Sequence, residues 1–280
     1  MKKNLILGLA PTLCLLMSAA APAFAAPTDW VSDEGGRVRL IVLPPEQDGT
    51  IRAALQVEPQ PGWITYWREP GDSGIPPSVT VTGSDGVALQ RIDFPVPQRL
   101  DIAGGWDMGY DTPVTFPLTL TADAGTLPSL DVAVFLGLCH DICIPFQADF
   151  KVAPDSDSYS ETPVLKAIMA AAESTLPEKS TADFAVTSAA IDGSSIAIAL
   201  TMPKAAGNAA PQLILANSKG FVIEAPQGVW SEDGQYRVTV PLSAIPAPFK
   251  AEDGAWQLLA KSDGRAMETA FSLSAAPQQN

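Results

Sequence analysis

Short runs of alternating or β-branched apolar residues, separated by turn sequences, recur along almost the whole of this 280-residue chain. Turn-forming residues are abundant, with 26 prolines and 21 glycines, and Gly83-Ser84-Asp85-Gly86 and Ile191-Asp192-Gly193 are examples of the turns. Short strands spaced in this way are typical of β-sandwiches. We therefore expect an all-β fold, with strands within residues 37–43, 53–57, 79–82, 116–121, 132–136, 195–201, 212–215, 235–242, 257–261 and 269–273.

One segment differs from the rest, because residues 162–174 are rich in alanine and follow a helical period. Its apolar residues Leu165, Ile168, Met169 and Ala172 share one helical face. Pro177 is expected to stop the helix soon afterwards. We predict that residues 155–180 form a connector with one short α-helix. The connector separates two β-sandwich domains, residues 26–154 and residues 181–280, which have the size of small sandwiches.

The N-terminus has the pattern of an export signal. Lys2 and Lys3 precede an apolar stretch at residues 5–20, and Ala23-Phe24-Ala25 has the form of a cleavage site. We predict that residues 1–25 are a cleaved secretory signal peptide, and an uncleaved membrane anchor is the alternative. No later stretch reaches the ~18 apolar residues that suggest a membrane helix, so we expect an exported, periplasmic protein without a transmembrane segment in its mature form.

Charge and residue counts restrict the chemistry of the exported chain. Its formal net charge is -14, and loss of two lysines with the signal peptide makes it -16. Such an acidic chain lacks the basic surface that nucleic-acid binding needs. Cleavage also removes Cys14, which leaves Cys139 and Cys143 as the two cysteines, with the single histidine, His140, between them.

The cysteine pair carries most of the chemistry that this chain offers. In the segment Cys139-His140-Asp141-Ile142-Cys143 the two cysteines are four positions apart. A disulfide between them would close a very short loop and add little stability by restricting the unfolded chain. Reversible thiol-disulfide exchange, a structural clip and metal binding all remain open, and the spacing favours exchange.

The neighbours of the cysteines influence each of these alternatives. His140 favours the reactive thiolate when it is protonated, whereas Asp141 and the acidic balance of the chain disfavour it. Cys139, His140 and Cys143 together would suit Cu(I). A tetrahedral zinc site would need a fourth ligand, and no second histidine is present. We expect no cofactor in the exchange function, and copper only in the alternative.

Aromatic residues are concentrated in the run from Pro61 to Pro77. Trp63, Tyr66 and Trp67 are followed there by a turn region rich in proline and glycine. The run forms either part of the core or a wall beside the cysteine loop, where Tyr66 would support the site.

Several motifs in a fixed order resemble the N-terminal periplasmic domain of the DsbD/ScsB thiol:disulfide interchange proteins. They are Gly62-Trp63 through Pro77, Phe94-Pro95, Gly109-Tyr110 and the segment from Cys139 to Pro145. The resemblance covers residues 30–153, and the rest of the chain more weakly. It implies an immunoglobulin-like fold in which a cysteine pair exchanges electrons with a membrane-embedded partner domain and with oxidised periplasmic proteins.

The resemblance also implies roles for individual residues. Cys143 matches the exposed nucleophile and Cys139 matches the resolving cysteine. A mobile cap loop with an aromatic residue shields the pair in this family. The matching stretch is residues 99–110, and Trp106 is the predicted shield, with His140, Asp141 and Tyr66 as supporting residues.

Two features depart from the family pattern. The sequence contains no membrane segment or C-x-x-C domain after the match, so we expect a separate membrane-embedded thiol reductase, a thioredoxin-like periplasmic protein, or both, as partners. The C-x-x-x-C spacing is closer to the ScsB-like branch, which is associated with copper tolerance. We predict a reductase-like thiol-disulfide exchange protein. The alternatives are a copper module using Cys139, His140 and Cys143, and a non-catalytic interaction domain with a structural disulfide.

Overall fold

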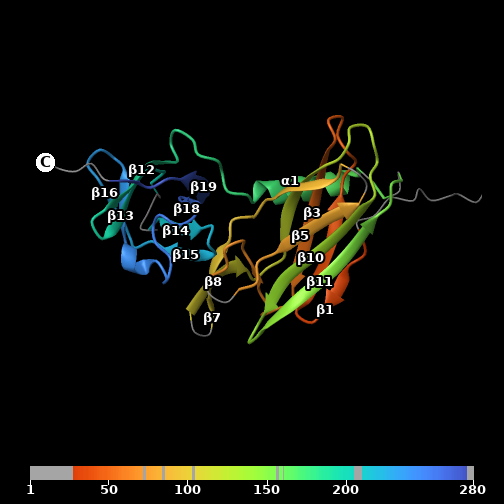
Figure 1. Cartoon of the computed structure of the whole chain (residues 1–280), viewed down its shortest axis with the longest axis horizontal. Coiled ribbons are helices and arrows are strands. Elements are labelled where there is room, and N and C mark those ends of the chain that lie inside the picture. Colours follow the sequence, from red (N-terminus) through yellow and green to blue (C-terminus); the bar gives the residue numbers. More distant parts are fainter. Residues whose placement is uncertain are drawn as a thin grey trace, which may run out of the picture.

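The computed structural model describes residues 28–71, 74–83, 86–102, 105–155, 158–159, 161–204 and 210–275. The predicted signal peptide and its cleavage site lie outside these residues. The described chain forms two β-sandwiches of almost entirely antiparallel strands, placed one after the other along the long axis of the molecule, with one α-helix beside the first (Figure 1). This arrangement confirms the all-β, immunoglobulin-like fold with a single short α-helix. The exact domain boundaries stay predictions.

The N-terminal sandwich, residues 31–152, contains a five-stranded sheet, β1-β2-β3-β9-β6, and a three-stranded sheet, β11-β10-β5. A third small sheet, β4-β8-β7, lies toward the other half of the molecule (Figure 1). The strands are β1 (Val31–Asp33), β2 (Gly36–Val42), β3 (Thr50–Pro59), β4 (Thr65–Tyr66), β5 (Ser78–Gly83), β6 (Ala88–Ile92), β7 (Gln98–Ile102), β8 (Gly105–Tyr110), β9 (Val114–Thr121), β10 (Leu130–Cys139) and β11 (Cys143–Val152).

The C-terminal sandwich, residues 185–275, consists of the sheets β16-β17-β13-β12-β20 and β15-β14-β18-β19. A single turn of 3₁₀-helix, η1 (Leu242–Ala244), follows β17. The strands are β12 (Ala185–Asp192), β13 (Ser195–Thr201), β14 (Gln212–Asn217), β15 (Phe221–Glu224), β16 (Val229–Trp230), β17 (Tyr236–Pro241), β18 (Trp256–Ser262), β19 (Arg265–Phe271) and β20 (Ser274–Ala275).

Helix α1 (Pro163–Ser174) covers the outer face of the first sheet. The Thr162 hydroxyl accepts a hydrogen bond from the backbone N–H of Leu165 at 3.2 Å, and Pro163 occupies the first turn, where its missing N–H costs nothing. Leu165 and Met169 pack with Ile41 and Ala54 of the adjacent strands β2 and β3. The predicted helix is thus confirmed, and it begins one residue later because Thr162 is its cap.

The end of β10 departs from the alternation of its first residues. Along most of β10 every second side chain faces the core, as expected for a strand with one solvated face. Residues 136–139 are all buried, because the chain around Ile64 and Ile75 covers the opposite side. Ile64 exchanges two backbone hydrogen bonds with Cys139, and the N–H of Gly137 donates to the Ile75 carbonyl at 3.1 Å. The aromatic run therefore lies against the strand that ends in the first cysteine.

Candidate redox site

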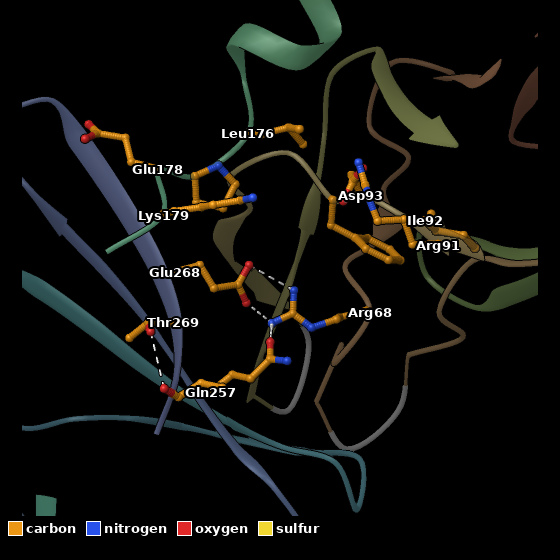
Figure 2. Close-up of a pocket in the computed structure, with 13 residues that line it drawn as sticks. Arg68, Arg91, Ile92, Asp93, Leu176, Glu178, Lys179, Gln257, Glu268 and Thr269 are labelled. Carbon is orange, nitrogen blue, oxygen red and sulfur yellow. Dashed lines mark hydrogen bonds and ion pairs between the residues drawn. The ribbon is translucent and has the colours of Figure 1, made fainter. Parts of the chain in front are cut away.

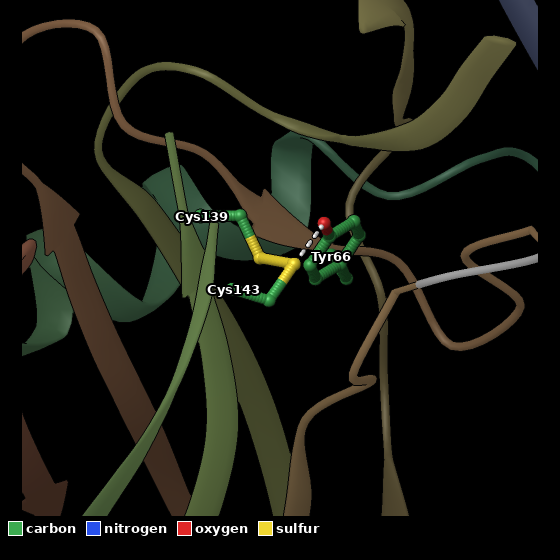
Figure 3. The surroundings of a disulfide bond; sticks show 3 residues. All are labelled: Tyr66, Cys139 and Cys143. Carbon is green, nitrogen blue, oxygen red and sulfur yellow. Dashed lines mark hydrogen bonds between the residues drawn. A yellow bond between two sulfur atoms is a disulfide. The ribbon is translucent and has the colours of Figure 1, made fainter. Parts of the chain in front are cut away.

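A β-hairpin brings the two cysteines directly opposite one another. β10 ends at Cys139 and β11 begins at Cys143, and the register of the two strands pairs these residues across a three-residue loop. A disulfide joins them, with 4.1 Å between their Cα atoms (Figure 3). The bond connects positions that the hairpin already holds together, so it adds no link between distant parts of the fold.

The two cysteines differ in their access to solvent. Cys139 is 4% exposed, whereas Cys143 is exposed at the start of an edge strand. The backbone of Cys139 also pairs with Ile64, with N···O distances of 2.8 and 3.0 Å. A thiolate arriving from outside therefore meets the Cys143 side of the disulfide.

Gly137 allows the aromatic run to approach the cysteine hairpin closely. A Cβ atom at this position would lie 2.9 Å from the Cβ of Ile75 and 3.2 Å from Cδ2 of Tyr66. Both distances are shorter than an ordinary van der Waals contact. The absence of a side chain at Gly137 thus leaves room for the Tyr66 ring beside the disulfide.

Tyr66 contacts the disulfide directly. Its hydroxyl lies 3.1 Å from Sγ of Cys143, and the residue is 1% exposed (Figure 3). A disulfide sulfur carries no hydrogen, so the tyrosine hydroxyl is the donor in this contact. Burial, followed by the charge of Asp107, raises the pKa of Tyr66 above its ordinary value. The hydroxyl therefore stays protonated and able to donate at neutral pH.

Asp107 is a member of the site that the sequence analysis missed. It lies on β8, is 1% exposed, and interacts with Tyr66 by charge and hydrogen bonding. An acidic residue in a short strand is usually expected to face solvent, so its burial was not predicted. The available signal was its position between Trp106 and Met108, inside the stretch that resembles the family's cap loop.

His140 and Asp141 lie in the hairpin loop, on the solvent side of the cysteines. His140 Nδ1 is 3.2 Å from Asp141 Oδ2, and the two side chains are 49% and 93% exposed. The imidazole is tilted against the ring of Trp63, with 5.9 Å between the ring centroids. The structure thus places both residues next to the disulfide, and their supporting roles stay predictions.

Trp106 lies on β8 and is half-buried against the apolar core. The guanidinium of Arg99, on the neighbouring strand β7, lies 5.3 Å from its ring centroid. Residues 103 and 104, which lie between these strands in the sequence, are outside the described part of the chain. The role of Trp106 as a shield for the cysteines stays a prediction.

Metal binding was the alternative use of the same residues. Within the described segments, no group of three or more His, Cys, Asp or Glu side chains is arranged to hold a metal ion. Cys139 and Cys143 are oxidised to a disulfide, so the Cu(I) site with His140 is a prediction for the reduced pair alone. A Cu(I) titration of the reduced protein, compared with the double cysteine-to-serine variant, would test it.

Comparison with solved structures shows a shared fold. The N-terminal periplasmic domain of ScsB from Proteus mirabilis is 21% identical, with a TM-score of 0.71 over 90% of this chain and 100% of that one. The GAE domain of GGA2p from Saccharomyces cerevisiae is 11% identical, with a TM-score of 0.29 over 46% and 100%. A variant of the Bacillus cereus major pilin subunit BcpA is 9% identical, with a TM-score of 0.25 over 86% and 66%. The last two similarities are too weak to support an argument.

The fold and the site define a class of protein: immunoglobulin-like domains that carry a thiol-disulfide pair on a hairpin. Residues 38–154 match the family described as "Thiol:disulfide interchange protein DsbD, N-terminal". The match covers the cysteine hairpin and most of the N-terminal sandwich, and this part of the chain is similar to the DsbD N-terminal family. No curated protein matches the chain. In the described residues, no helix has the length and apolarity needed to cross a membrane.

Proposed function

We propose that this protein is a periplasmic thiol-disulfide exchange protein that relays reducing equivalents through Cys139 and Cys143. The observation that carries the proposal is the asymmetry of the disulfide, in which Cys143 is exposed and Cys139 is buried. A disulfide with one accessible sulfur suits exchange, because the attacking thiolate and the departing sulfur are then fixed by geometry.

The exchange proceeds in two balanced steps. A thiolate of a reduced partner attacks Sγ of Cys143, a partner–Cys143 disulfide forms, and Cys139 leaves as a thiolate and takes up a proton. A second thiolate of the partner attacks its own sulfur in this mixed disulfide and releases Cys143. The partner dithiol is thereby oxidised to a disulfide, and the Cys139–Cys143 pair gains two electrons and two protons.

The reduced pair then repeats the sequence in reverse on an oxidised acceptor. The Cys143 thiolate attacks the acceptor's disulfide, and Cys139 resolves the mixed disulfide. The Tyr66 hydroxyl, 3.1 Å from the Cys143 sulfur, stabilises a thiolate there by donating a hydrogen bond. The nearby charge of Asp107 acts in the opposite direction, which suits a relay that must release electrons as well as accept them.

Partner proteins follow from the family match. A membrane-embedded thiol reductase is the proposed donor, and a thioredoxin-like periplasmic protein is the proposed acceptor. The match of residues 38–154 to an interchange family and the predicted signal peptide support this assignment. No cofactor is required, because the electrons move with the sulfur–sulfur bonds.

Redox equilibration with glutathione tests the proposal, together with trapping of partners in periplasmic extracts. We expect the Cys139→Ser variant to accumulate mixed disulfides at Cys143. The matched Cys143→Ser variant keeps only the buried Cys139 and is expected to trap far less. A pair that stays oxidised below about -300 mV, in the range of structural disulfides, and that traps no partner would contradict the proposal.

A further inference from the structure

Arg68 connects the redox half of the molecule to the C-terminal sandwich. Its guanidinium forms an ion pair with Glu268 of β19, in which Nη1 lies 3.2 Å from Oε2, and Nη2 donates to Oε1 of Gln257 at 2.6 Å (Figure 2). The Arg68 and Glu268 side chains are only 22% and 18% exposed. An ion pair that is this far removed from water holds its partners in a specific geometry, because either charge alone would be poorly solvated.

The same arginine is fixed from its own side of the interface. Its guanidinium lies 4.0 Å from the centroid of the Trp67 ring, which is 1% exposed. The backbone N–H of Trp67 donates to the Met108 carbonyl at 3.0 Å. Arg68 therefore has little freedom to move independently of the strand that precedes it.

That strand also holds the hydroxyl at the disulfide. β4 ends at Tyr66, which pairs with Gly109 of β8 and places its hydroxyl 3.1 Å from Cys143 Sγ. Tyr66 and Arg68 are two residues apart, so their Cα atoms are at most about 7 Å apart. One short segment is thus held by the disulfide at one end and by Glu268 at the other.

The two sandwiches also share apolar packing, so that Glu268 is a fixed point. Ile214, Ala216 and Leu259 of the C-terminal sandwich belong to the same buried cluster as the core of the N-terminal sandwich. The side chain of Lys261 donates to the Pro97 carbonyl, and Arg99 pairs with Glu224. These contacts hold β19 in place beside Arg68.

We propose that Arg68 is a positioning residue for the redox disulfide, and that the C-terminal sandwich acts on the site through the Arg68–Glu268 ion pair. Glu268 fixes Arg68, Arg68 fixes the end of β4, and β4 holds the Tyr66 hydroxyl at the Cys143 sulfur. The inference rests on the proposed exchange function and assigns a role in it to the second sandwich.

The test measures how fast Cys143 of the reduced full chain reacts with iodoacetamide and with oxidised glutathione across pH, read by mass mapping of the Cys143 peptide. Glu268→Gln keeps the shape of the side chain and removes its charge. We expect a rate at neutral pH about fivefold lower than in the wild type, at the lower end of coupling between sites. We also expect the pH midpoint of the reaction to move upward, since a displaced Tyr66 no longer donates to the thiolate.

Glu178→Gln is the matched control. Glu178 pairs with Arg265, which lies on β19 as Glu268 does. Glu178 lines the same cleft as Arg68, but its ion pair does not involve β4 or Arg68. We expect its rate to stay within about twofold of the wild type. Arg68→Lys keeps the positive charge but cannot form the bidentate contact of a guanidinium. We expect its Cys143 reaction rate to lie between those of the wild type and Glu268→Gln.

A double variant separates positioning from general loosening. If Arg68 acts through Tyr66, Tyr66→Phe combined with Glu268→Gln reacts no more slowly than Tyr66→Phe alone. The inference is overturned if the double variant shows the product of the two single-variant rate losses. It is also overturned if Glu268→Gln reacts as fast as the wild type. A wild-type protein that does not exchange with glutathione would instead count against the proposed function itself.

Discussion

The Tyr66 hydroxyl contacts the disulfide, and the buried Asp107 carboxylate interacts with that tyrosine. Tyr66 donates a hydrogen bond toward Cys143 Sγ, which favours a thiolate, and Asp107 contributes a negative charge, which disfavours it. Both residues are about 1% exposed, so water screens neither effect strongly. The reactivity of Cys143 is therefore a balance that single substitutions should shift in either direction.

Asp107→Asn should make Cys143 more reactive. Removing the charge takes away the repulsion that a thiolate at Cys143 meets, and we expect the pH midpoint of alkylation to fall by about one unit. The measurement is the rate of Cys143 alkylation against pH in the reduced protein. Asp141→Asn removes a carboxylate that is 93% exposed, and water screening should limit its effect to a few tenths of a unit. Equal shifts in the two variants would contradict this account.

Glu69→Gln should stabilise the protein at alkaline pH and leave its stability unchanged in acid. Burial raises the pKa of Glu69 from 4.5 to about 7, against the opposing charge of Arg68. The folded state therefore favours the protonated acid, and this contribution is lost as pH rises from about 4.5 to about 7. Urea unfolding should show a gain of about 1 kcal/mol at pH ~8, allowing for partial exposure, and none at pH ~4. A gain of equal size at both pH values would rule out titration of Glu69 as the cause.

The sequence identified the two cysteines and Tyr66 as members of the site, but it did not identify Asp107. Cys139 and Cys143 stood out because they lie four positions apart in an otherwise cysteine-poor chain. The aromatic run drew attention to Tyr66, although not to its contact with one particular sulfur. Asp107 was missed because its burial depends on β4 and β8 pairing in space, and no local pattern encodes that pairing.

Strands β10 and β11 form the hairpin on which the chemistry depends. β11 was absent from the predicted strands. It contains Pro145, which is tolerated there because β11 is an edge strand. β10 was predicted from its alternation, but that pattern does not indicate that residues 136–139 are buried on both faces. The cover comes from the chain around Ile64 and Ile75, which lies far from β10 in sequence.

Gly137→Ala should disturb this cover. The new methyl group would collide with the Cβ of Ile75. The Ile75 carbonyl already accepts a hydrogen bond from the Gly137 N–H, so the backbone around Ile75 must move to make room. We expect a loss of about 1–3 kcal/mol in the free energy of unfolding, the usual cost of overpacking, and faster alkylation of Cys139. Gly105→Ala is the control, since a methyl group there meets no atom within 4 Å. Equal stability of the two variants, measured by urea unfolding, would show that the close approach carries no constraint.

The two sandwiches are joined by apolar packing as well as by the connector. Ile214, Ala216 and Leu259 contribute to the apolar cluster of the N-terminal sandwich, while Leu258 belongs to the core of the C-terminal one. The run Leu213 to Ala216 is continuously buried, as expected for a strand covered on both faces. Its sequence indicates burial but does not identify the surface that covers it. The sequence analysis therefore predicted two domains joined by a connector, without the packing between them.

This packing predicts that the two halves unfold together. Leu259 is 1% exposed and faces the N-terminal cluster, whereas its neighbour Leu258 is 0% exposed and faces the C-terminal core. Truncation of either leucine to alanine should cost about 2–5 kcal/mol. The effect on cooperativity should differ, because only Leu259→Ala weakens the contact between the halves.

Differential scanning calorimetry distinguishes the two variants. We expect a single transition for the wild type and for Leu258→Ala, the latter at lower temperature, and two separate transitions for Leu259→Ala. Hydrogen exchange adds a local measurement, since strands β3 and β10 should lose protection together with β14 in the wild type, and at different free energies in Leu259→Ala. Two transitions in the wild type would mean that the halves are energetically independent. The C-terminal sandwich could then not hold Arg68 rigidly enough to influence Cys143.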